Sequence, residues 1–333
     1  MKITVNLAHK SYDIFIEKDI LQNIGAYLDL TNRKILIISD EGVPMYYRDT
    51  VYRQCASAFL YVIPSGETSK SLSTHQKIME FMLENKFTRK DLVIALGGGV
   101  VGDLSGFVAS TYMRGISYIS IPTTTLSQID SSIGGKTGVN LGKVKNIVGS
   151  FYHPDFVFVD INTLKTLTKR QYHSGLVEAL KAGLIYDKEL FELFENYEEN
   201  LEQIIYKSLL VKKDVVEKDE KEQNLRKILN FGHTLGHGIE SFYHFSYLHG
   251  ECVAFGMIPM IKDLELRNNV IKILNKMEID TNITYDFDKV FEIVKLDKKS
   301  NGDSITIVMV SSVGSFELID ISIDKLYLLM KGQ

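Results

Sequence analysis

The first half of the chain alternates short apolar segments with helical patterns and brief polar turns. The apolar segments lie at residues 34–39, 59–63, 91–96, 116–121 and 156–159. Continuous apolar runs of this length are typical of parallel strands buried on both faces, so we expect an open parallel α/β sheet. Residues 2–6 and 12–16 alternate apolar and polar positions and predict a pair of strands, and residues 72–85 predict a helix.

The pattern changes near residue 160. From there helical periodicity prevails to about residue 297, and only residues 305–310 and 315–321 predict further strands. A chain of 333 residues is longer than one hydrophobic core usually organises. We therefore expect two domains: an α/β domain over residues 1–160 and a mostly α-helical domain over residues 161–333.

Composition restricts the kind of protein. The net charge of −4 excludes a general basic surface for nucleic acid, so any anion must be bound by local groups. Cys55 and Cys252 match no disulfide or CxxC pattern, which suits a reducing compartment. The first residues look like strands rather than a signal peptide, and no apolar run approaches the length of a membrane span. We expect a cytoplasmic protein without nucleic-acid or membrane partners.

A glycine-rich loop follows the strand expected at residues 91–96. Gly97, Gly99 and Gly102 fit the pattern G-x-G-x-x-G, in which backbone N–H groups and a helix N-terminus approach a pyrophosphate. The loop follows the third buried strand rather than the first, unlike the usual dinucleotide fingerprint, and a tight strand–helix turn explains the glycines equally well. Asp40, at another strand end, suits either a ribose hydroxyl or a helix cap.

Residues 122–154 are rich in Thr, Ser, Gly, Lys and Asn, and their apolar residues follow no clear period. Such a segment would make a poor core. It favours an anion-binding surface, with Lys136, Lys143 and Lys145 as point charges and backbone amides as donors. A solvated flexible loop is the alternative, and the apolar strands at both ends of the segment argue against it.

Residues 229–257 hold half of the chain's eight histidines together with two acids. These residues are His233, His237, His244 and His249, with Glu240 and Glu251. Imidazole and carboxylate are the ligands of a catalytic zinc site, and two histidines four residues apart share one helical face. By analogy with HExxH helices, His233 with His237 is the obvious pair, although a polar helix face explains such a pair too. Spacing alone does not choose the ligands.

Glu178 and Lys181 lie three residues apart in another helical pattern and share its face with apolar residues. Ionisable side chains at such positions usually reach solvent along the edge of the face. The alternative is a metal ligand beside an anion contact. Spacing does not decide between these roles.

Six motifs, taken together, resemble the 3-dehydroquinate synthase family of sugar-phosphate cyclases. They are GGGVVGD (97–103), PTTTLSQIDSSIGGKTGVN (122–140), KNIVGSFYHP (145–154), GLVEALKAG (175–183), LRKILNFGHTLGH (225–237) and HGECVAFGM (249–257). Their order and spacing agree across nearly the whole chain. The resemblance implies a Rossmann-like α/β domain that binds NAD, a helical domain that binds metal and substrate, and an active site in the cleft between them.

The resemblance also implies a ligand set for Zn²⁺, with Co²⁺ as an alternative metal. The Glu of VEALK, the first His of GHxxGH and the His of HGE are here Glu178, His233 and His249. His237 then contacts the substrate phosphate or transfers a proton. One departure from the family is Gly238, where alanine is commoner, and we expect this glycine to cost about 1 kcal/mol of helix stability.

Further roles are carried over from the family by motif. Residues implied in NAD binding are Asp40, Glu67, Lys70, Gly99, Val100, Val101, Gly102, Asp103, Thr123, Thr124, Lys136, Lys145, Thr163, Leu164, Lys165 and Thr166. Residues implied in substrate binding or catalysis are Asp130, Lys136, Asn146, Lys181, Lys212, Arg226, Asn230, His237 and one of Lys298 and Lys299, with Lys298 preferred. Arg114 matches an arginine that the family lends across a homodimer interface to the substrate phosphate.

The reaction implied is that of a phosphorus–oxygen lyase of the shikimate pathway. It converts 3-deoxy-arabino-heptulosonate 7-phosphate, a sugar-acid phosphate, to 3-dehydroquinate and phosphate by transient oxidation with NAD, β-elimination, reduction and intramolecular aldol closure. Two alternatives are a related cyclase whose substrate lacks the carboxylate and a metal-dependent polyol dehydrogenase. A third is an inactive protein that only binds NAD or metal.

Overall fold

The computed structural model describes residues 1–142, 144–244, 246–298 and 304–331, with the side chains of residues 296–298 excepted. The chain divides into two compact units, Met1–Leu167 and Thr168–Gln333. The sequence predicted the change of architecture near residue 160. A 3-10 turn, η5 (Ile161–Thr166), follows the last strand of the first unit and belongs to that unit.

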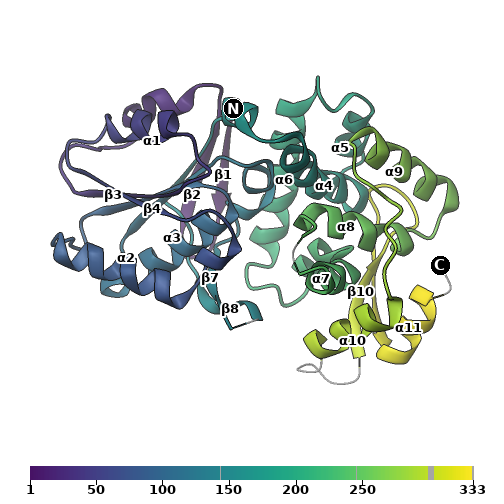
Figure 1. Ribbon diagram of the computed structural model, residues 1–333. Helices are drawn as coiled ribbons and strands as arrows, with labels where there is room; N and C mark the ends of the chain where they lie inside the picture. The colour runs from purple at the N-terminus through teal and green to yellow at the C-terminus, as the bar shows by residue number, and fades with distance from the viewer. Residues whose placement is uncertain (143, 245, 299–303, 332–333) are drawn as a thin grey trace. The chain divides into compact units, whose positions relative to one another are not determined.

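The first unit is built on a seven-stranded sheet (Figure 1). In order across the sheet the strands are β1 (Lys2–Asn6), β2 (Ser11–Ile16), β9 (Phe156–Val159), β6 (Ser117–Pro122), β5 (Leu92–Gly97), β3 (Ile35–Asp40) and β4 (Ala58–Ile63). β1 and β2 are antiparallel, and every other neighbouring pair is parallel. The α/β sheet predicted from the apolar runs is therefore confirmed.

Helices cover both faces of this sheet. α2 (Leu72–Glu84) and α3 (Gly99–Thr111) pack on the face to which Leu36 and Ile38 point. The 3-10 segment η1 (Ile20–Ala26) and α1 (Met45–Tyr52), which the sequence did not predict, pack on the face to which Ile35 and Ile37 point (Figure 1). Because both faces are covered, the strands need apolar side chains at successive positions.

The strand order places the glycine loop at a topological switch point. Along the chain, β5 is followed by β6 on one side of it, whereas β3 is followed by β4 on the opposite side. The loops after β3 and β5 therefore leave the sheet in opposite directions. Ligands of open α/β sheets bind where this reversal occurs, at the carboxyl ends of the strands. The loop that looked misplaced along the sequence is at the usual place in the fold.

Residues 136–151 show no clear period in the sequence, yet they form an antiparallel hairpin of β7 (Lys136–Leu141) and β8 (Val144–Phe151). The glycines explain why the pattern was obscure. A Cβ on Gly149 would come within 2.0 Å of the carbonyl oxygen of Thr137, and a Cβ on Gly138 within 2.5 Å of that of Val148. Glycine at these two positions lets the strands pass very close together.

The second unit is mainly helical, as the sequence predicted, and has one small sheet. Its elements include α4 (Lys169–Ile185), α5 (Lys188–Glu192), α6 (Leu201–Lys218), η7 (Leu225–Asn230), α7 (His233–Phe242), α8 (His249–Met257), α9 (Leu264–Lys276), α10 (Phe287–Lys298), β10 (Ser304–Met309), β11 (Glu317–Ser322) and α11 (Ile323–Lys331). α8 packs against both α4 and α7, with Gly250 against the backbone of Ser174 and Gly256 against that of Gly232. No helix in the described parts of the chain is long and apolar enough to cross a membrane.

Candidate metal centre and cofactor-binding region

Three side chains from three helices of the second unit converge. Glu178 lies in the middle of α4, and His233 and His249 are the first residues of α7 and α8. Oε1 of Glu178 is 3.7 Å from Nε2 of His233 and 3.4 Å from Nε2 of His249. One ligand atom from each of the three lies within 4.8 Å of the others. The helices thus bring together residues that are up to 71 positions apart, 178 and 249, in the sequence.

This arrangement fits a divalent metal ion. Glu178 is only 3% exposed, and neither of its carboxylate oxygens has a hydrogen-bond partner, although Lys181 contacts one of them as an ion pair. A buried carboxylate without hydrogen bonds is costly, and coordination of a cation removes that cost. Two imidazole nitrogens and one carboxylate also leave open positions for substrate oxygens, as in catalytic zinc sites.

Burial and neighbouring charges favour the metal-binding protonation states of two of the three ligands. Burial opposes the charge on Glu178, but Lys181 and the protonated ring of His249 outweigh it and hold the carboxyl pKa well below its ordinary value. Burial, helped by Lys181, lowers the pKa of His233 well below its ordinary value. The carboxylate is therefore ionised and the His233 imidazole neutral, which are the protonation states that bind metal.

His249 differs because it lies between two acids. Its Nε2 faces Glu178, and its Nδ1 lies 3.5 Å from Oε2 of Glu240 on α7. Burial opposes protonation, but the two carboxylates prevail and raise the pKa of His249 to about 9. Metal binding through Nε2 must therefore displace a proton from this ring.

His237 lies beside these residues rather than among the three that surround Glu178. Its ring centroid is 5.2 Å from that of His233 and 5.9 Å from that of His249, and its side chain is exposed. A second set, His237, Glu240 and His249, also brings its ligand atoms within 4.8 Å. Both sets need His249, and only the first contains a buried carboxylate that lacks hydrogen bonds.

In the first unit, the N-terminus of α3 lies against the turn that follows β6. The backbone N–H of Thr123 donates to the carbonyl of Gly97, and a Cβ on Gly98 would lie 3.0 Å from the methyl group of Thr124. A Cβ on Gly102 would meet nothing within 4 Å. Glycine is thus needed at position 98 for the turn itself, whereas Gly102 leaves open space at the start of the helix. That space suits the approach of a phosphate to backbone N–H groups.

A buried lysine links three segments near this helix. Lys70 is 5% exposed, and its Nζ lies 2.5 Å from Oδ2 of Asp103 and also contacts the side chain of Asn146 in the hairpin. Nearby, Nδ2 of Asn140 donates to Oε1 of Glu67 at 2.8 Å. Burial raises the pKa of Asp103, and Lys70 offsets this only in part. The residues implied in NAD binding at 67, 70 and 103 therefore form one connected group.

Comparison with known proteins decides the family. The model of the 3-dehydroquinate synthase N-terminal domain matches residues 60–174, and that of the C-terminal domain matches residues 175–300. The 3-dehydroquinate synthase of Clostridium kluyveri is 43% identical over 349 residues, which cover 98% of this chain and 97% of the relative. The chain belongs to the 3-dehydroquinate synthase family.

Solved structures of other sugar-phosphate cyclases share the fold. A 2-deoxy-scyllo-inosose synthase, complexed with carbaglucose-6-phosphate, NAD⁺ and Co²⁺, has a TM-score of 0.86 and 26% identity over 99% of this chain and 98% of its own. A 2-epi-5-epi-valiolone synthase from Streptomyces hygroscopicus subsp. jinggangensis, with NAD⁺ and Zn²⁺ bound, has a TM-score of 0.87 and 25% identity over 98% of each chain. The resemblance to this group of enzymes is confirmed.

The substrate residues that the 3-dehydroquinate synthase motifs imply in the second unit are mostly buried cations. Lys181 and Arg226 are each 2% exposed, and Lys212 is 9% exposed. Lys181 donates to the carbonyl of Leu229 at 2.6 Å, and Arg226 donates to that of Glu220. Asn230 is exposed. An anion bound beside such desolvated cations interacts with them more strongly than it would in water.

In the first unit, the implied substrate residues follow the turn after β6. Asp130 lies in a short π-helical turn, η4 (Ser127–Ser131), and Lys136 is exposed at the start of β7. Lys136 lines a small hollow together with Gly102 and Asp103. This places an implied substrate cation next to the helix N-terminus expected to bind NAD.

Some implied NAD residues cannot offer their side chains. Val101 is fully buried in the core, and Leu164 is 4% exposed. The hydroxyl of Thr163 donates to the carbonyl of Asp160 and accepts from Gln128, so it is already satisfied. Any contact of these residues with NAD therefore runs through the backbone, whereas Lys165 and Thr166 are exposed. The side chain of Lys298 and all of Lys299 lie outside the described residues.

Three residues near the metal ligands received no role from the sequence. They are Arg170 on α4, Glu240 on α7 and Glu251 on α8. The acids were visible among the histidines, but the periodicity of one helix does not reveal which residue of another helix it meets. Only the packing of α4, α7 and α8 brings Glu240 to His249 and Arg170 to Glu251.

Proposed function

We propose that this chain converts 3-deoxy-arabino-heptulosonate 7-phosphate to 3-dehydroquinate and phosphate, as a phosphorus–oxygen lyase. The observation that carries the proposal is the buried Glu178 carboxylate facing His233 and His249 in a chain of the 3-dehydroquinate synthase family. The glycine loop at the switch point supports the NAD requirement.

The cofactors supply the redox and Lewis-acid chemistry. Zinc or cobalt, held by Glu178, His233 and His249, would stabilise negative charge on hydroxyl oxygens of the substrate. NAD, held by residues of the first unit, would accept a hydride from the substrate and later return it, so it is not consumed.

The chain's own side chains bind the substrate and move protons. Lys181, Lys212 and Arg226 bind its phosphate and carboxylate by charge-assisted hydrogen bonds, with Lys136 adding a fourth cation. Asn146 and Asn230 orient hydroxyl groups. Further proposed contacts are Lys145 to NAD and Lys298 to the substrate.

Two side chains are proposed for proton transfer. His237 is exposed and lies beside the ligand histidines, so its imidazole can exchange a proton with a bound substrate and with water. Asp130 is half-buried in the turn after β6 and acts as the second such group. Neither residue is needed to hold the metal.

The enzyme is further proposed to act in the cytoplasm as a homodimer. A functional role for Arg114 is supported by the turn that holds it. Met113 and Arg114 have φ values of 48° and 70°, and both side chains are exposed. A left-handed backbone at two consecutive non-glycine residues is costly and often marks a functional position. Arg114 would contact the substrate phosphate of the partner subunit.

Phosphate release from the purified protein tests the function. With 3-deoxy-arabino-heptulosonate 7-phosphate as substrate, phosphate should appear only when NAD and metal are both present, and a chelator should stop it. The Glu178→Ala variant is the matched inactive control. Phosphate release that continues without metal or NAD would contradict the proposal.

A second candidate function is that of a cyclase acting on a sugar phosphate without a carboxylate. The TM-score of 0.86 to the synthase complexed with carbaglucose-6-phosphate favours it. The same assay with glucose 6-phosphate separates the two. Phosphate release from glucose 6-phosphate, and none from the heptulosonate, would select this second function.

A further inference from the structure

His249 stands at the first position of α8, so its position depends on how α8 packs against the neighbouring helices. Residues spaced by four on α4 lie on one face of that helix. Three such residues meet three consecutive residues of α8. The pairs are Arg170 with Glu251, Ser174 with Gly250, and Glu178 with His249. These three contacts fix the position of the start of α8 relative to α4. The metal ligands Glu178 and His249 form the contact at one end of this row.

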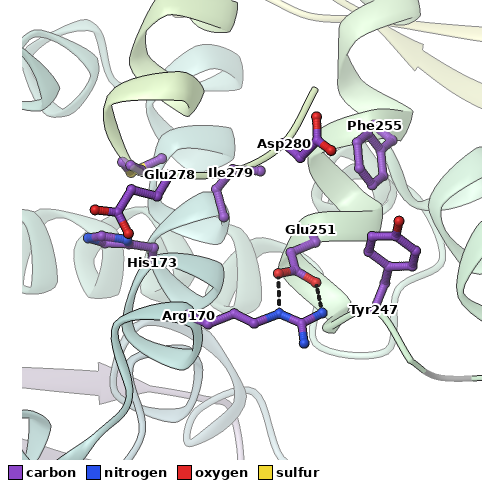
Figure 2. Close-up of a pocket in the computed structure, with 9 residues that line it drawn as sticks. Arg170, His173, Tyr247, Glu251, Phe255, Glu278, Ile279 and Asp280 are labelled. Carbon is purple, nitrogen blue, oxygen red and sulfur yellow. Dashed lines mark hydrogen bonds and ion pairs between the residues drawn. The ribbon is translucent and has the colours of Figure 1, made fainter. Parts of the chain in front are cut away.

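The contact at the other end of the row is a bidentate ion pair between Arg170 and Glu251 (Figure 2). Nε and Nη2 of Arg170 donate to Oε1 and Oε2 of Glu251, each at 2.7 Å. Oε2 also accepts from the backbone N–H of Leu248 at 2.7 Å, which ties the carboxylate to the residue before His249. A bidentate arginine–carboxylate pair is directional as well as strong. It therefore holds the first turn of α8 in one register against α4.

The ring of His249 has its own constraint. Glu240, 7% exposed on α7, places Oε2 3.5 Å from Nδ1, on the opposite side of the ring from Glu178. In metal sites the nitrogen that does not bind metal usually donates to a carboxylate, a backbone carbonyl or water, which fixes the tautomer and the ring orientation. Here that leaves Nε2 free to face Glu178.

We propose that Glu240 and the Arg170–Glu251 pair are positioning residues that present Nε2 of His249 to the metal. Glu251 and Arg170 fix the position of the backbone at the start of α8, and Glu240 fixes the orientation of the His249 ring. The inference rests on the proposed metal site and deepens it. The competing explanation is that these contacts stabilise the helices and leave metal binding unaffected.

Two substitutions act on these contacts with little change in packing: Arg170→Gln breaks the bidentate ion pair, and Glu240→Gln weakens the contact with Nδ1 of His249. The Arg170 side chain is 54% exposed and borders a cavity of about 310 Å³, so Arg170→Gln leaves no void in the core. Glu240→Gln keeps the size of a buried side chain but removes its charge. Ser241→Ala on the same helix is the matched control, because the Ser241 side chain is neither a proposed ligand nor hydrogen-bonded among the described residues.

The test measures the zinc dissociation constant of each folded protein by competition with a chromogenic chelator. Loss of an outer contact to a metal ligand typically weakens metal binding about 10–100-fold. We expect a loss in that range for Arg170→Gln and for Glu240→Gln, and wild-type affinity for Ser241→Ala. Saturating zinc should restore most of the turnover rate of both variants, but none of that of Glu178→Ala.

Wild-type zinc affinity in either variant, with or without a lower melting temperature, overturns the proposal for that residue. His249→Ala separates this failure from failure of the metal site itself. If His249→Ala also binds zinc as the wild type does, the ligand set is wrong. If His249→Ala loses zinc while the other variants keep it, the ligand set stands and the positioning role falls.

Discussion

Lys181 is the residue that makes the buried Glu178 tolerable before metal binds. Two ionised groups that are each nearly inaccessible to water stabilise one another, and removing one partner leaves an unpaired buried charge. The lysine also raises the cost of protonating His233, so it helps to keep that ring neutral. One side chain thus prepares both a carboxylate and an imidazole for coordination.

The roles of the neighbouring histidines are separable by substitution. His249→Ala should lose zinc on dialysis, because it removes one of three ligands, and its activity should fall to background. His237→Ala should keep its zinc and lose most of its activity, since it lacks only a proton-transfer group. Metal content and phosphate release are measured on the same samples. A His237→Ala protein that loses zinc, beside a His249→Ala protein that keeps it, would reverse the assignment.

His75 is a buried histidine of the first unit, remote in sequence from the metal ligands. It is 7% exposed, stacks on Phe107 at 4.5 Å between ring centroids, and places Nε2 2.8 Å from the hydroxyl of Thr111. Burial lowers its pKa below the ordinary value of 6.5. The neutral ring therefore contributes stability above pH 6.5, and this contribution is lost as the pH falls from 6.5 through the pKa of the folded state.

We therefore expect His75→Gln to flatten the dependence of unfolding free energy on pH below 6.5. The wild type should lose stability more steeply there, by at most about 1.4 kcal/mol per pH unit, the slope for one proton. Urea unfolding of both proteins at a series of pH values measures the difference. Parallel curves would show that His75 is protonated equally easily in the folded and unfolded states.

At the scale of elements, glycine serves different purposes at two helical positions: Gly238 allows close packing, whereas Gly102 leaves open space. A Cβ on Gly238 of α7 would lie 2.7 Å from Cγ2 of Val294 and 3.1 Å from Cγ1 of Val290 on α10. The sequence predicted that Gly238 would merely cost helix stability. That expectation omitted the close packing of α10, which alanine would disturb. Gly102 of α3 has no such neighbour and leaves room for a ligand.

Alanine at these two positions should therefore act differently. Gly238→Ala should lower the free energy of unfolding, because overpacking costs about 1–3 kcal/mol and exceeds the roughly 1 kcal/mol gained in helix propensity. Gly102→Ala should keep or raise stability but weaken NAD binding. Thermal unfolding and NAD titration of both variants check this. A stabilised Gly238→Ala protein would show that α10 moves away at little cost.

Much of the first unit could be predicted from the sequence, because a strand buried on both faces must be apolar at every position. Residues 92–97 illustrate this. The hairpin of β7 and β8 could not, because Gly138 and Gly149 remove the alternation that marks strands. The sequence indicated that the glycine loop could bind a pyrophosphate, but not where the loop lies in the sheet. Its place at the switch point depends on strand order, which periodicity along the chain does not encode.

For the metal site, the sequence indicated which residue types could bind the ion, whereas only the fold shows which of these residues lie next to one another. Spacing on one helix suggested His233 with His237, and resemblance to the family implied Glu178, His233 and His249. The structure brings the latter three around one point. Contacts between helices, such as Glu240 with His249, could not be predicted because they depend on how α7 and α8 pack.

At the scale of the whole molecule, the proposed dimer makes a prediction about mixed subunits. Arg114→Ala and His249→Ala should each be inactive alone. If Arg114 acts on the partner's substrate, a mixed dimer contains one site with both residues intact. Activity should then reappear when the two proteins are unfolded together and refolded. No recovery, with mixed dimers present, would place Arg114 in the active site of its own subunit.

The central claim is that NAD is recycled within each turnover rather than consumed. The measurement that tests it most directly follows phosphate release and NADH absorbance together, with a large excess of 3-deoxy-arabino-heptulosonate 7-phosphate over NAD and with zinc present. The account predicts phosphate release that continues far beyond one equivalent of NAD, with no accumulation of NADH. Release that stops after one equivalent, with NADH rising in step, would contradict it and identify a dehydrogenase.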